Sequence, residues 1–282
     1  AILALQNGEV DAYQMTPQQV KKLDLDASNL TAYSYTEGRV GYLQFNCNRV
    51  TDENVRKALL FAMDRKAMDD AAFESDKYYS IPYTFLPTNS QFYTEDGVEK
   101  YEQDVDKAKS MLEDAGVSGL KLKLGYMSSD AVQSAQALLI QEQLKEVGVT
   151  VELAGGDGTA IANAMKDPDN EYDMYLGGYI MGIDPDTFSS LFENDGAYNY
   201  MHYSGYDTID QLFEEGRSEL DESARKETYA KLQAAVQDTG AFYPIISNNK
   251  ILVVNNRIQG VEDAGLVPVY TFEDTSSLKL AE

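Results

Sequence analysis

Apolar residues along the chain alternate between the three-to-four-residue spacing of amphipathic helices and the two-residue spacing of strands. The clearest helical pattern follows the capping sequence at residues 51–53 and is predicted to close at Asp64 and Arg65. Its apolar positions share one helix face and are Val55, Ala58, Leu59, Ala62 and Met63. Further helices are predicted at residues 2–6, from Pro17 onward, and at 104–115, 131–147, 208–220 and 222–237.

Strands are predicted where apolar residues alternate with polar ones or form short continuous runs. These segments are residues 10–13, 42–46, 120–126, 149–153 and 172–179, followed by a pair of short strands at 243–246 and 251–254. Residues 78–92, which include Pro82 and Pro87, are predicted to form a long irregular loop. The order strand, helix, strand, helix, strand through residue 179 predicts an α/β fold with crossover helices.

The composition is that of a folded protein with a substantial core. The chain has 282 residues, of which 43% are hydrophobic and 11% aromatic. This length allows two lobes or one large α/β domain, because single cores stop growing near about 250–300 residues. The sequence starts at Ala1 within a helical pattern, without an initiator Met or a signal peptide, and this start predicts a piece of a longer protein.

The charge balance is strongly acidic. The chain carries 23 Lys and Arg against 47 Asp and Glu, for a formal net charge of -24. Such a field repels phosphate backbones and anionic lipid surfaces, so nucleic acid is excluded as a partner and cationic or amine-bearing partners are favoured.

Cys47 is the only cysteine, which excludes an intrachain disulfide and a cysteine metal cluster. No run of apolar residues approaches the ~18 that a membrane span requires.

One acidic and aromatic stretch is a candidate recognition surface. The predicted strand at 172–179 leads into a loop at 180–186, and an aromatic tract follows at 198–203. Between Asp167 and Gly216 the chain contains twelve acidic residues and no Lys or Arg. A strand that leads into a glycine-flanked loop with tyrosines and carboxylates is typical of a ligand-binding surface. The alternative is a solvated acidic face, whose charges would repel one another.

Little in the sequence points to catalysis. His202 is the only histidine, and neither a Gly-x-Ser-x-Gly motif nor a His-Glu-x-x-His motif is present. Residues 167–173 resemble a calcium-binding loop, but Tyr172 occupies the position that requires glycine. Gly177 and Gly178 are expected to permit close backbone packing or a bulge rather than to bind phosphate. We therefore expect a binding protein without enzymatic activity, cofactor or bound metal.

Two groups of residues have competing interpretations. Tyr198, Tyr200 and Tyr203, which lie near His202, are predicted to line a pocket; the alternative is an edge strand that covers a core. Asp184 precedes a proline and is expected to cap a short helix, with a direct ligand contact as the alternative.

Several short motifs occur in the order in which one protein family has them. They are YLQFN at 42–46, NVRKAL at 54–59 with MDR at 63–65, DKAK at 106–109 with AG at 115–116, QLKEVG at 143–148, YDM at 172–174, DPD at 184–186 with Phe188, and RKETY at 225–229. Together they resemble the peptide/nickel class, family 5, of the solute-binding proteins of ABC importers. Each motif alone is ordinary helix or strand sequence, whereas their shared order over most of the chain is specific.

The resemblance implies a type II periplasmic-binding-protein fold of class C, in which two α/β lobes enclose a ligand. It implies a partial first lobe at residues 1–46, a nearly complete second lobe at 47–243, and a return into the first lobe with a C-terminal tail at 244–282. It further implies an extracytoplasmic protein, either periplasmic or a cell-surface lipoprotein, whose only membrane attachment is an anchor missing from this sequence. The expected partners are a peptide or other small ligand and the permease subunits of an ABC importer.

The resemblance also implies positions for ligand contacts. In peptide-binding members, an aspartate three residues after the aromatic that ends the central strand pairs with the ligand's amino terminus. Counting from Tyr179, that position is Gly182, and the nearest acid is Asp184. Dipeptide-binding members carry an arginine on the preceding helix for the ligand carboxylate, whereas residues 160–166 offer only Lys166. The predicted ligand-binding residues are Tyr179, Met181, Gly182, Asp184, Tyr198, Tyr200 and His202.

The expected function is the capture of peptides between two lobes for delivery to a permease. One alternative is a sensor or interaction protein that uses the same fold to bind a peptide signal. Another is the binding of nickel or a metal chelate, which a single histidine disfavours.

Overall fold

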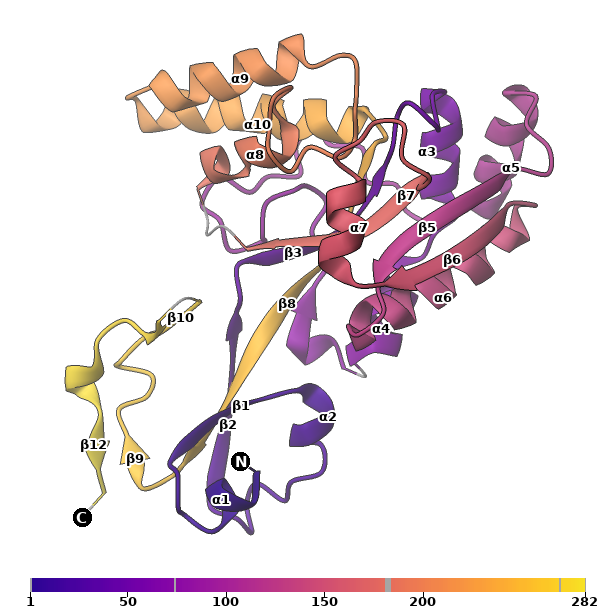
Figure 1. Ribbon diagram of the computed structural model, residues 1–282. Coiled ribbons are helices and arrows are strands. Elements are labelled where there is room, and N and C mark those ends of the chain that lie inside the picture. Colours follow the sequence, from indigo (N-terminus) through magenta and orange to yellow (C-terminus); the bar gives the residue numbers. More distant parts are fainter. Residues whose placement is uncertain (1, 74, 181–183, 269, 282) are drawn as a thin grey trace.

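The computed structural model describes residues 2–73, 75–180, 184–268 and 270–281 (Figure 1). Met181 and Gly182, two of the predicted ligand-binding residues, lie outside this range. Most of the chain forms a mixed β-sheet with helices on both faces, and the first and last segments of the chain lie together at one end of the molecule. The α/β fold class predicted from the sequence is confirmed.

The helices begin and end at local sequence signals. They are α1 (Ile2–Gln6), α2 (Pro17–Val20), α3 (Glu53–Phe61), α4 (Arg65–Phe73), α5 (Val105–Asp114), α6 (Ala131–Glu146), α7 (Gly158–Ala164), α8 (Ser189–Phe192), α9 (Asp207–Ser218) and α10 (Glu222–Asp238), with 3-10 turns η1 (Asp76–Tyr78), η2 (Pro185–Phe188) and η3 (Thr275–Ser277). Asp52, Asp104, Asp130 and Asp221 cap α3, α5, α6 and α10, because each carboxylate accepts a backbone N–H of the first turn. Gly148 follows α6 with a φ of 80°, a left-handed conformation that favours glycine.

The central sheet joins strands from distant parts of the chain. The strands are β1 (Ala12–Met15), β2 (Leu30–Thr36), β3 (Arg39–Phe45), β4 (Tyr79–Ser80), β5 (Lys121–Met127), β6 (Thr150–Gly156), β7 (Met174–Ile180), β8 (Phe242–Asn255), β9 (Ile258–Gln259), β10 (Leu266–Val267), β11 (Thr271–Phe272) and β12 (Lys279–Leu280). The strand order is β1-β8-β3-β7-β5-β6, and β2 and β4 also pair with β8. Strand β5 is parallel to β6 and β7, whereas β3 is antiparallel to β7 and β8. The parallel strands and their connecting helices α6 and α7 agree with the predicted crossover arrangement.

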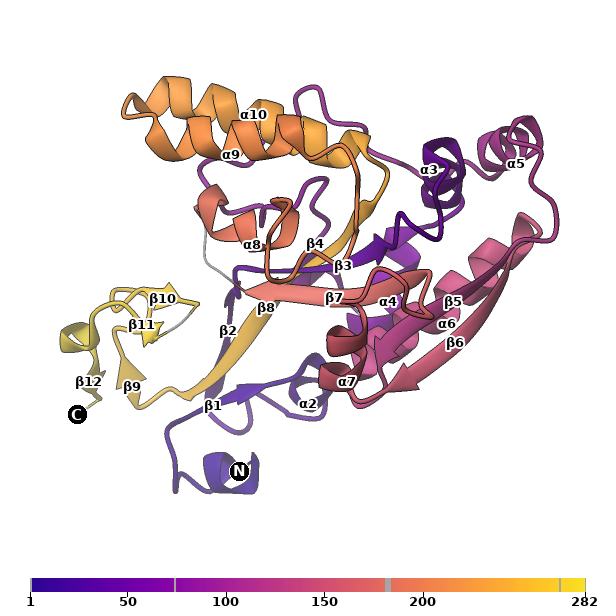
Figure 2. The same ribbon diagram turned by 45° about the horizontal axis from the view of Figure 1, so that its top comes forward.

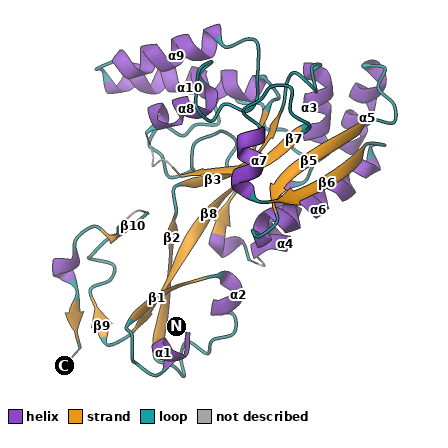
Figure 3. Ribbon diagram, in the orientation of Figure 1, coloured by secondary structure: helices purple, strands orange, loops and turns teal. Residues whose placement is uncertain are grey.

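The residues predicted as two short strands near the C-terminus do form a strand, but the predicted break between them is wrong, because β8 is one continuous strand of 14 residues (Figure 3). Its first half pairs with β3, and its second half pairs with β1 and β2. The polar residues in its middle, such as Ser247 and Asn248, stay extended because they pair with β4. Strand β3 pairs with β7 on its other edge, so it belongs to the same sheet as residues 174–180. The division of the chain at residues 46 and 243 stays a prediction.

Two further segments differ from the sequence analysis. The helix predicted after residues 51–53 is confirmed as α3, but its predicted end is wrong, because α3 ends at Phe61 and Arg65 begins a separate helix, α4. Asp64 starts this second helix, since its carboxylate accepts the backbone N–H of Ala67 at 3.0 Å. Strand β2 is not among the predicted elements, and its partner β8 lies at the other end of the chain.

Hydrophobic clusters lie on opposite faces of β3 and β7. On one face, Leu43 and Leu176 pack with residues of α3 to α6. On the other face, Tyr42 and Phe242 pack with residues of α8, α9 and α10, which form a layer over these strands (Figure 2). Smaller clusters, one of them around Leu5, connect α1, β1, β2 and the second half of β8. Among the helices described here, none is both long and apolar enough to cross a membrane.

Candidate functional site

A groove of about 900 Å³ opens where the two halves of β8 meet. One wall consists of β1 and α2, and the opposite wall consists of the end of α4, the loop after β5 and the start of α6. Residues at the crossing of the strands also line it, namely Glu37, Arg39, Ile180, Asn248 and Lys250. The groove therefore lies between the segment formed by the chain ends and the larger α/β part.

The topology explains why a groove lies at this edge of the sheet. Strands β5 and β7 are parallel, so their carboxyl ends, Met127 and Ile180, reach the same edge, and both residues line the groove. In open α/β sheets, ligands bind in the crevice outside the carboxyl ends of the strands. The position of the groove is thus that of a ligand-binding crevice.

The predicted site residues that the structure describes lie elsewhere. Tyr179, Asp184, Tyr198, Tyr200 and His202 are not among the residues that line the groove. Tyr179 neighbours Ile180 in β7, but its side chain points to the opposite face of the sheet, toward the cluster of α8 to α10. Their roles as ligand contacts stay predictions.

Tyr179 and Tyr198 belong to an aromatic group outside the groove. The ring centroid of Tyr179 lies 5.6 Å from that of Phe188 and 5.8 Å from that of Tyr198. Tyr198 remains 47% exposed at the rim of this group. Tyr179 packs against the hydrophobic cluster of α8 to α10, and Tyr198 contacts Tyr179 while remaining about half exposed.

Tyr200 and His202 have structural contacts. Tyr200 is buried against Ile161 and Met165, and its ring lies edge-on to Tyr175 at 5.8 Å. Burial raises the pKa of Tyr200 to about 12. The Nε2 atom of His202 lies 2.8 Å from the carbonyl oxygen of Met165. No strand forms over residues 197–206, so the alternative of an edge strand through Tyr198 and Tyr200 is wrong.

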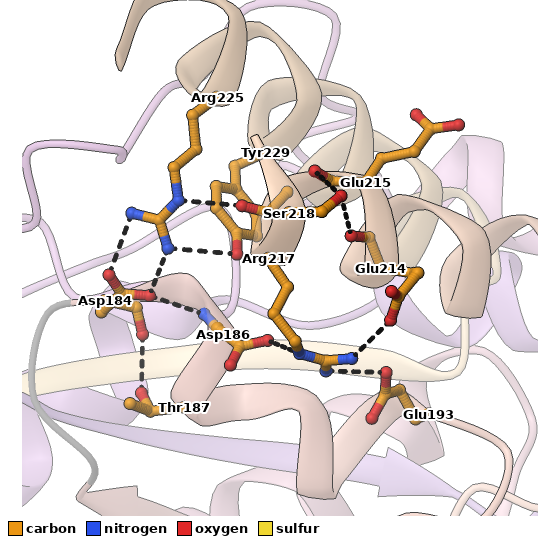
Figure 4. Close-up of polar contacts among 11 residues, drawn as sticks. Asp184, Asp186, Thr187, Glu193, Glu214, Glu215, Arg217, Ser218, Arg225 and Tyr229 are labelled. Atoms are coloured by element: carbon orange, nitrogen blue, oxygen red, sulfur yellow. Dashed lines mark hydrogen bonds and ion pairs between the residues drawn. The ribbon is translucent and has the colours of Figure 1, made fainter. Parts of the chain in front are cut away.

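Asp184 caps the turn η2, as the sequence analysis expects. Its Oδ1 accepts the backbone N–H of Asp186 at 3.0 Å. Both carboxylate oxygens also accept hydrogen bonds from Arg225, at 3.1 and 3.0 Å (Figure 4). This fork arrangement is the strong form of an arginine–carboxylate pair. A ligand amine would have to compete with this arginine for the carboxylate, and the predicted contact stays a prediction.

Basic residues from other parts of the chain neutralise much of the acidic stretch. Arg217 forms ion pairs with Asp186, Glu193 and Glu214 (Figure 4). Six of the twelve acids form such pairs in total, and the other three are Glu171 with Lys123, Asp173 with Arg49, and Asp184 with Arg225. The mutual repulsion expected of this acidic stretch is therefore reduced for at least half of these residues, and the choice between a recognition surface and a solvated face stays open.

The paired glycines of β7 allow close packing, as predicted. A methyl group at Gly177 would lie 2.6 Å from the ring of Tyr42, and one at Gly178 would lie 2.0 Å from the guanidinium of Arg39. Both distances are too short for a real side chain, so only glycine fits without movement of these neighbours. The ring of Tyr42 is buried, and burial raises its pKa well above the usual range.

The charged residues of the groove are not among the residues predicted from the sequence. Arg39 begins β3, and Glu37 and Asn248 lie beside it at the strand crossing. Asn248 comes from β8, more than half the chain away from the other two. The one local signal is a lone arginine at the start of a strand, and such a residue is common on protein surfaces.

A family comparison identifies the protein class. The model of the bacterial extracellular solute-binding proteins, family 5 (middle region), matches residues 1–200. The chain belongs to this family. It is a family of binding proteins, and the predicted family resemblance is confirmed.

Solved structures of family members show the same fold. The ABC transporter substrate-binding protein CtaP of Listeria monocytogenes is 38% identical, with a TM-score of 0.93 over 100% of this chain and 58% of that chain. A putative peptide-binding protein AppA from Clostridium difficile is 32% identical, with a TM-score of 0.90 over 99% of this chain and 58% of that chain. The type II periplasmic-binding-protein fold is thereby confirmed.

The chain is also similar to longer curated proteins. The oligopeptide-binding protein AppA of Bacillus subtilis is 24% identical over 91% of this chain and 50% of its own length. The chain thus spans about half the length of the curated relatives that it matches.

Proposed function

We propose that this solute-binding protein captures peptides outside the cytoplasmic membrane and delivers them to the permease of an ABC importer. The observation that carries the proposal is the groove of about 900 Å³ between two parts of the molecule that β8 connects. Its volume lies within the range of about 300–1,000 Å³ typical of small-molecule sites. The family and the printed names of its oligopeptide-binding and peptide-binding members support peptides as the ligand class.

The connections between the two parts suit a hinge. Strand β8 passes between them without interruption, and the second connection is the short segment between β2 and β3. Gly38 in that segment has a φ of 68°, which favours glycine. A change of the backbone angles at these crossings would close the walls of the groove over a bound ligand, and a permease would recognise the closed form. Binding and release by this motion require no chemical step.

The ligand carried by the protein tests the proposal. The protein is purified, as its gene encodes it, from its native host, and mass spectrometry identifies the molecules that dissociate from it on denaturation. We expect a mixture of peptides, and deletion of the gene is expected to reduce uptake of labelled peptides of the same kind.

Other ligands would lead to other functions. Bound nickel or a metal chelate, without peptides, would contradict the peptide proposal and favour metal uptake. Bound peptides combined with unchanged uptake in the deletion strain would contradict the transport part and favour a peptide sensor.

A further inference from the structure

Arg39 differs from the other arginines of this acidic chain. Five arginines form ion pairs, namely Arg49, Arg65, Arg217, Arg225 and Arg257. Arg56 is buried and donates to the backbone carbonyls of Val50, Thr51 and Thr239. Within the described part of the chain, the guanidinium of Arg39 has one hydrogen-bond partner, the amide oxygen of Asn248 at 3.3 Å, and no carboxylate partner. A guanidinium has five N–H donors, so most of its hydrogen-bonding capacity remains available.

The surroundings of Arg39 hold its side chain in position. The guanidinium lies against backbone at Gly178 and Gly41, where a methyl group would approach it to 2.0 and 3.5 Å respectively. Asn248 donates its amide N–H to Glu37, so its amide oxygen faces Arg39. Glycines beneath the guanidinium and an oriented amide beside it reduce the freedom of a side chain that is otherwise flexible. An ordered binding group loses less conformational entropy when a ligand binds.

The other charged residues that line the groove already have partners. The carboxylate of Asp130 caps α6 by accepting the N–H groups of Val132 and Gln133. Glu37 accepts from Asn248, and Lys250 donates to the carbonyl oxygen of Pro268 at 2.7 Å. Among the described residues of the groove, Arg39 and Lys250 are thus the cations without a carboxylate partner, and Arg39 is the one whose planar fork of N–H donors matches a carboxylate.

We propose that Arg39 binds a carboxylate of the ligand and makes the groove selective for ligands that carry one. This inference rests on the proposed function. The planar fork of a guanidinium matches a carboxylate through two parallel hydrogen bonds. Binding would also supply the counter-ion that this arginine lacks in a chain with a net charge of -24. The carboxylate comes either from the C-terminus of a peptide or from an acidic side chain.

Pools of short random peptides test the inference with the protein as its gene encodes it. The pools have free or amidated C-termini, and each kind is prepared with and without Asp and Glu. Retained peptides are identified by mass spectrometry, and the affinity of a retained peptide and of its amidated form is measured by calorimetry. The same measurements use Arg39→Gln and Arg39→Lys, with Arg257→Gln as a control that removes an exposed charge of another surface site. Thermal melts compare the folding of all variants.

The expected result is a preference of the wild-type protein for carboxylate-bearing peptides by about 10- to 100-fold, the strength of hydrogen bonds to a charged group. Arg39→Gln abolishes this preference, Arg39→Lys keeps part of it, and Arg257→Gln keeps all of it. If Arg39→Gln loses the preference for free over amidated C-termini, the bound group is the main-chain carboxylate. If it loses only the preference for Asp- and Glu-containing pools, the bound group is a side-chain carboxylate.

Several results would overturn the inference. They are the absence of a preference in the wild-type protein, an unchanged preference in Arg39→Gln, and equal weakening of all pools, which would indicate a structural role. If Arg39→Gln does not fold, Arg39→Lys provides the test. A full preference of Arg39→Lys for carboxylate-bearing peptides would count against the fork geometry. Retention of no peptide by the wild-type protein would instead overturn the proposed function, and this inference with it.

Discussion

The two faces of the β3–β7 pair differ in what covers their adjacent glycines. On one face, the buried ring of Tyr42 lies over Gly177 and contacts the ring of Phe242 at 4.7 Å. On the other face, the side chain of Arg39 lies over Gly178 and reaches the groove. Gly177 therefore allows an aromatic ring to pack on one face, whereas Gly178 makes room for a charged group on the other face. We call these the aromatic face and the groove face, and each prediction below tests the difference between them.

The largest expected effect concerns the aromatic face. Phe242 is fully buried, and its ring lies 5.0 Å from that of Phe192 in addition to its contact with Tyr42. Phe242→Ala should reduce the free energy of unfolding by about 3–5 kcal/mol, because a large cavity forms in a packed core. The matched change on the groove face, Ile180→Ala at a residue that is 50% exposed, should alter it by no more than about 0.5 kcal/mol. Chemical denaturation measures both values, and similar losses would contradict the distinction between the faces.

The two glycines provide a closer comparison. Gly177→Ala should cost about 1–3 kcal/mol of stability, because the ring of Tyr42 is held by its neighbours and has no free space to enter. Gly178→Ala should cost much less, since the guanidinium of Arg39 is the end of a flexible side chain beside an open groove. Gly178→Ala should instead weaken peptide binding by displacing Arg39. Denaturation and calorimetry on both variants check this, and an equal loss of stability would show that Arg39 is as rigidly packed as Tyr42.

A buried carboxyl group in the helices of the groove face should make stability depend on pH. Asp69 of α4 is fully buried, and its nearest hydrogen-bond donor is the amide of Gln136 in α6 at 3.4 Å. Burial raises the pKa of Asp69 to about 8. The native state therefore favours the protonated form, so stability is greatest below the unfolded-state pKa of about 3.9 and falls as the pH rises toward that of the folded state.

Comparison with Asp69→Asn measures this dependence. Between about pH 6 and about pH 9, the wild-type protein should lose roughly 2 kcal/mol of stability relative to the variant. Denaturation at a series of pH values gives the difference directly. Parallel curves for the two proteins would mean that Asp69 is ionised in the native state at neutral pH.

The smallest expected effect on stability is that of a substitution at Asp184, which caps η2 next to the helices of the aromatic face. Asp184→Asn keeps an oxygen that can cap η2 but removes the charge that pairs with Arg225. Because this pair is partly exposed, the change should cost at most about 1 kcal/mol and should leave peptide affinity unchanged. Thermal melts and calorimetry test both parts. A loss of affinity at an unchanged melting temperature would support the predicted contact between Asp184 and a ligand amine.

Local sequence was sufficient for the elements whose signals lie within a few residues. The carboxylates of Asp52 and Asp104 start helices and Gly116 and Gly148 end them, because capping depends on groups in the same turn. The spacing of apolar residues likewise predicted β5, α6, β6 and β7, and the order of motifs predicted the family. The cap role of Asp184 belongs to the same class, since its partner is two residues away.

Contacts between distant segments required the folded chain. The pairing of Arg217 with Asp186 and of Arg225 with Asp184 joins residues 31 and 41 positions apart, and no local pattern encodes it. The continuity of β8 depends on β3, β1 and β2 from the opposite end of the chain, which pair with its two halves, and on β4, which pairs with its polar middle. Arg39 acquires its place for the same reason, because Gly178 and Asn248 come from β7 and β8 and meet it only in the assembled sheet. Hydrogen-bond partners across a sheet follow from register and topology, and these are properties of the tertiary structure.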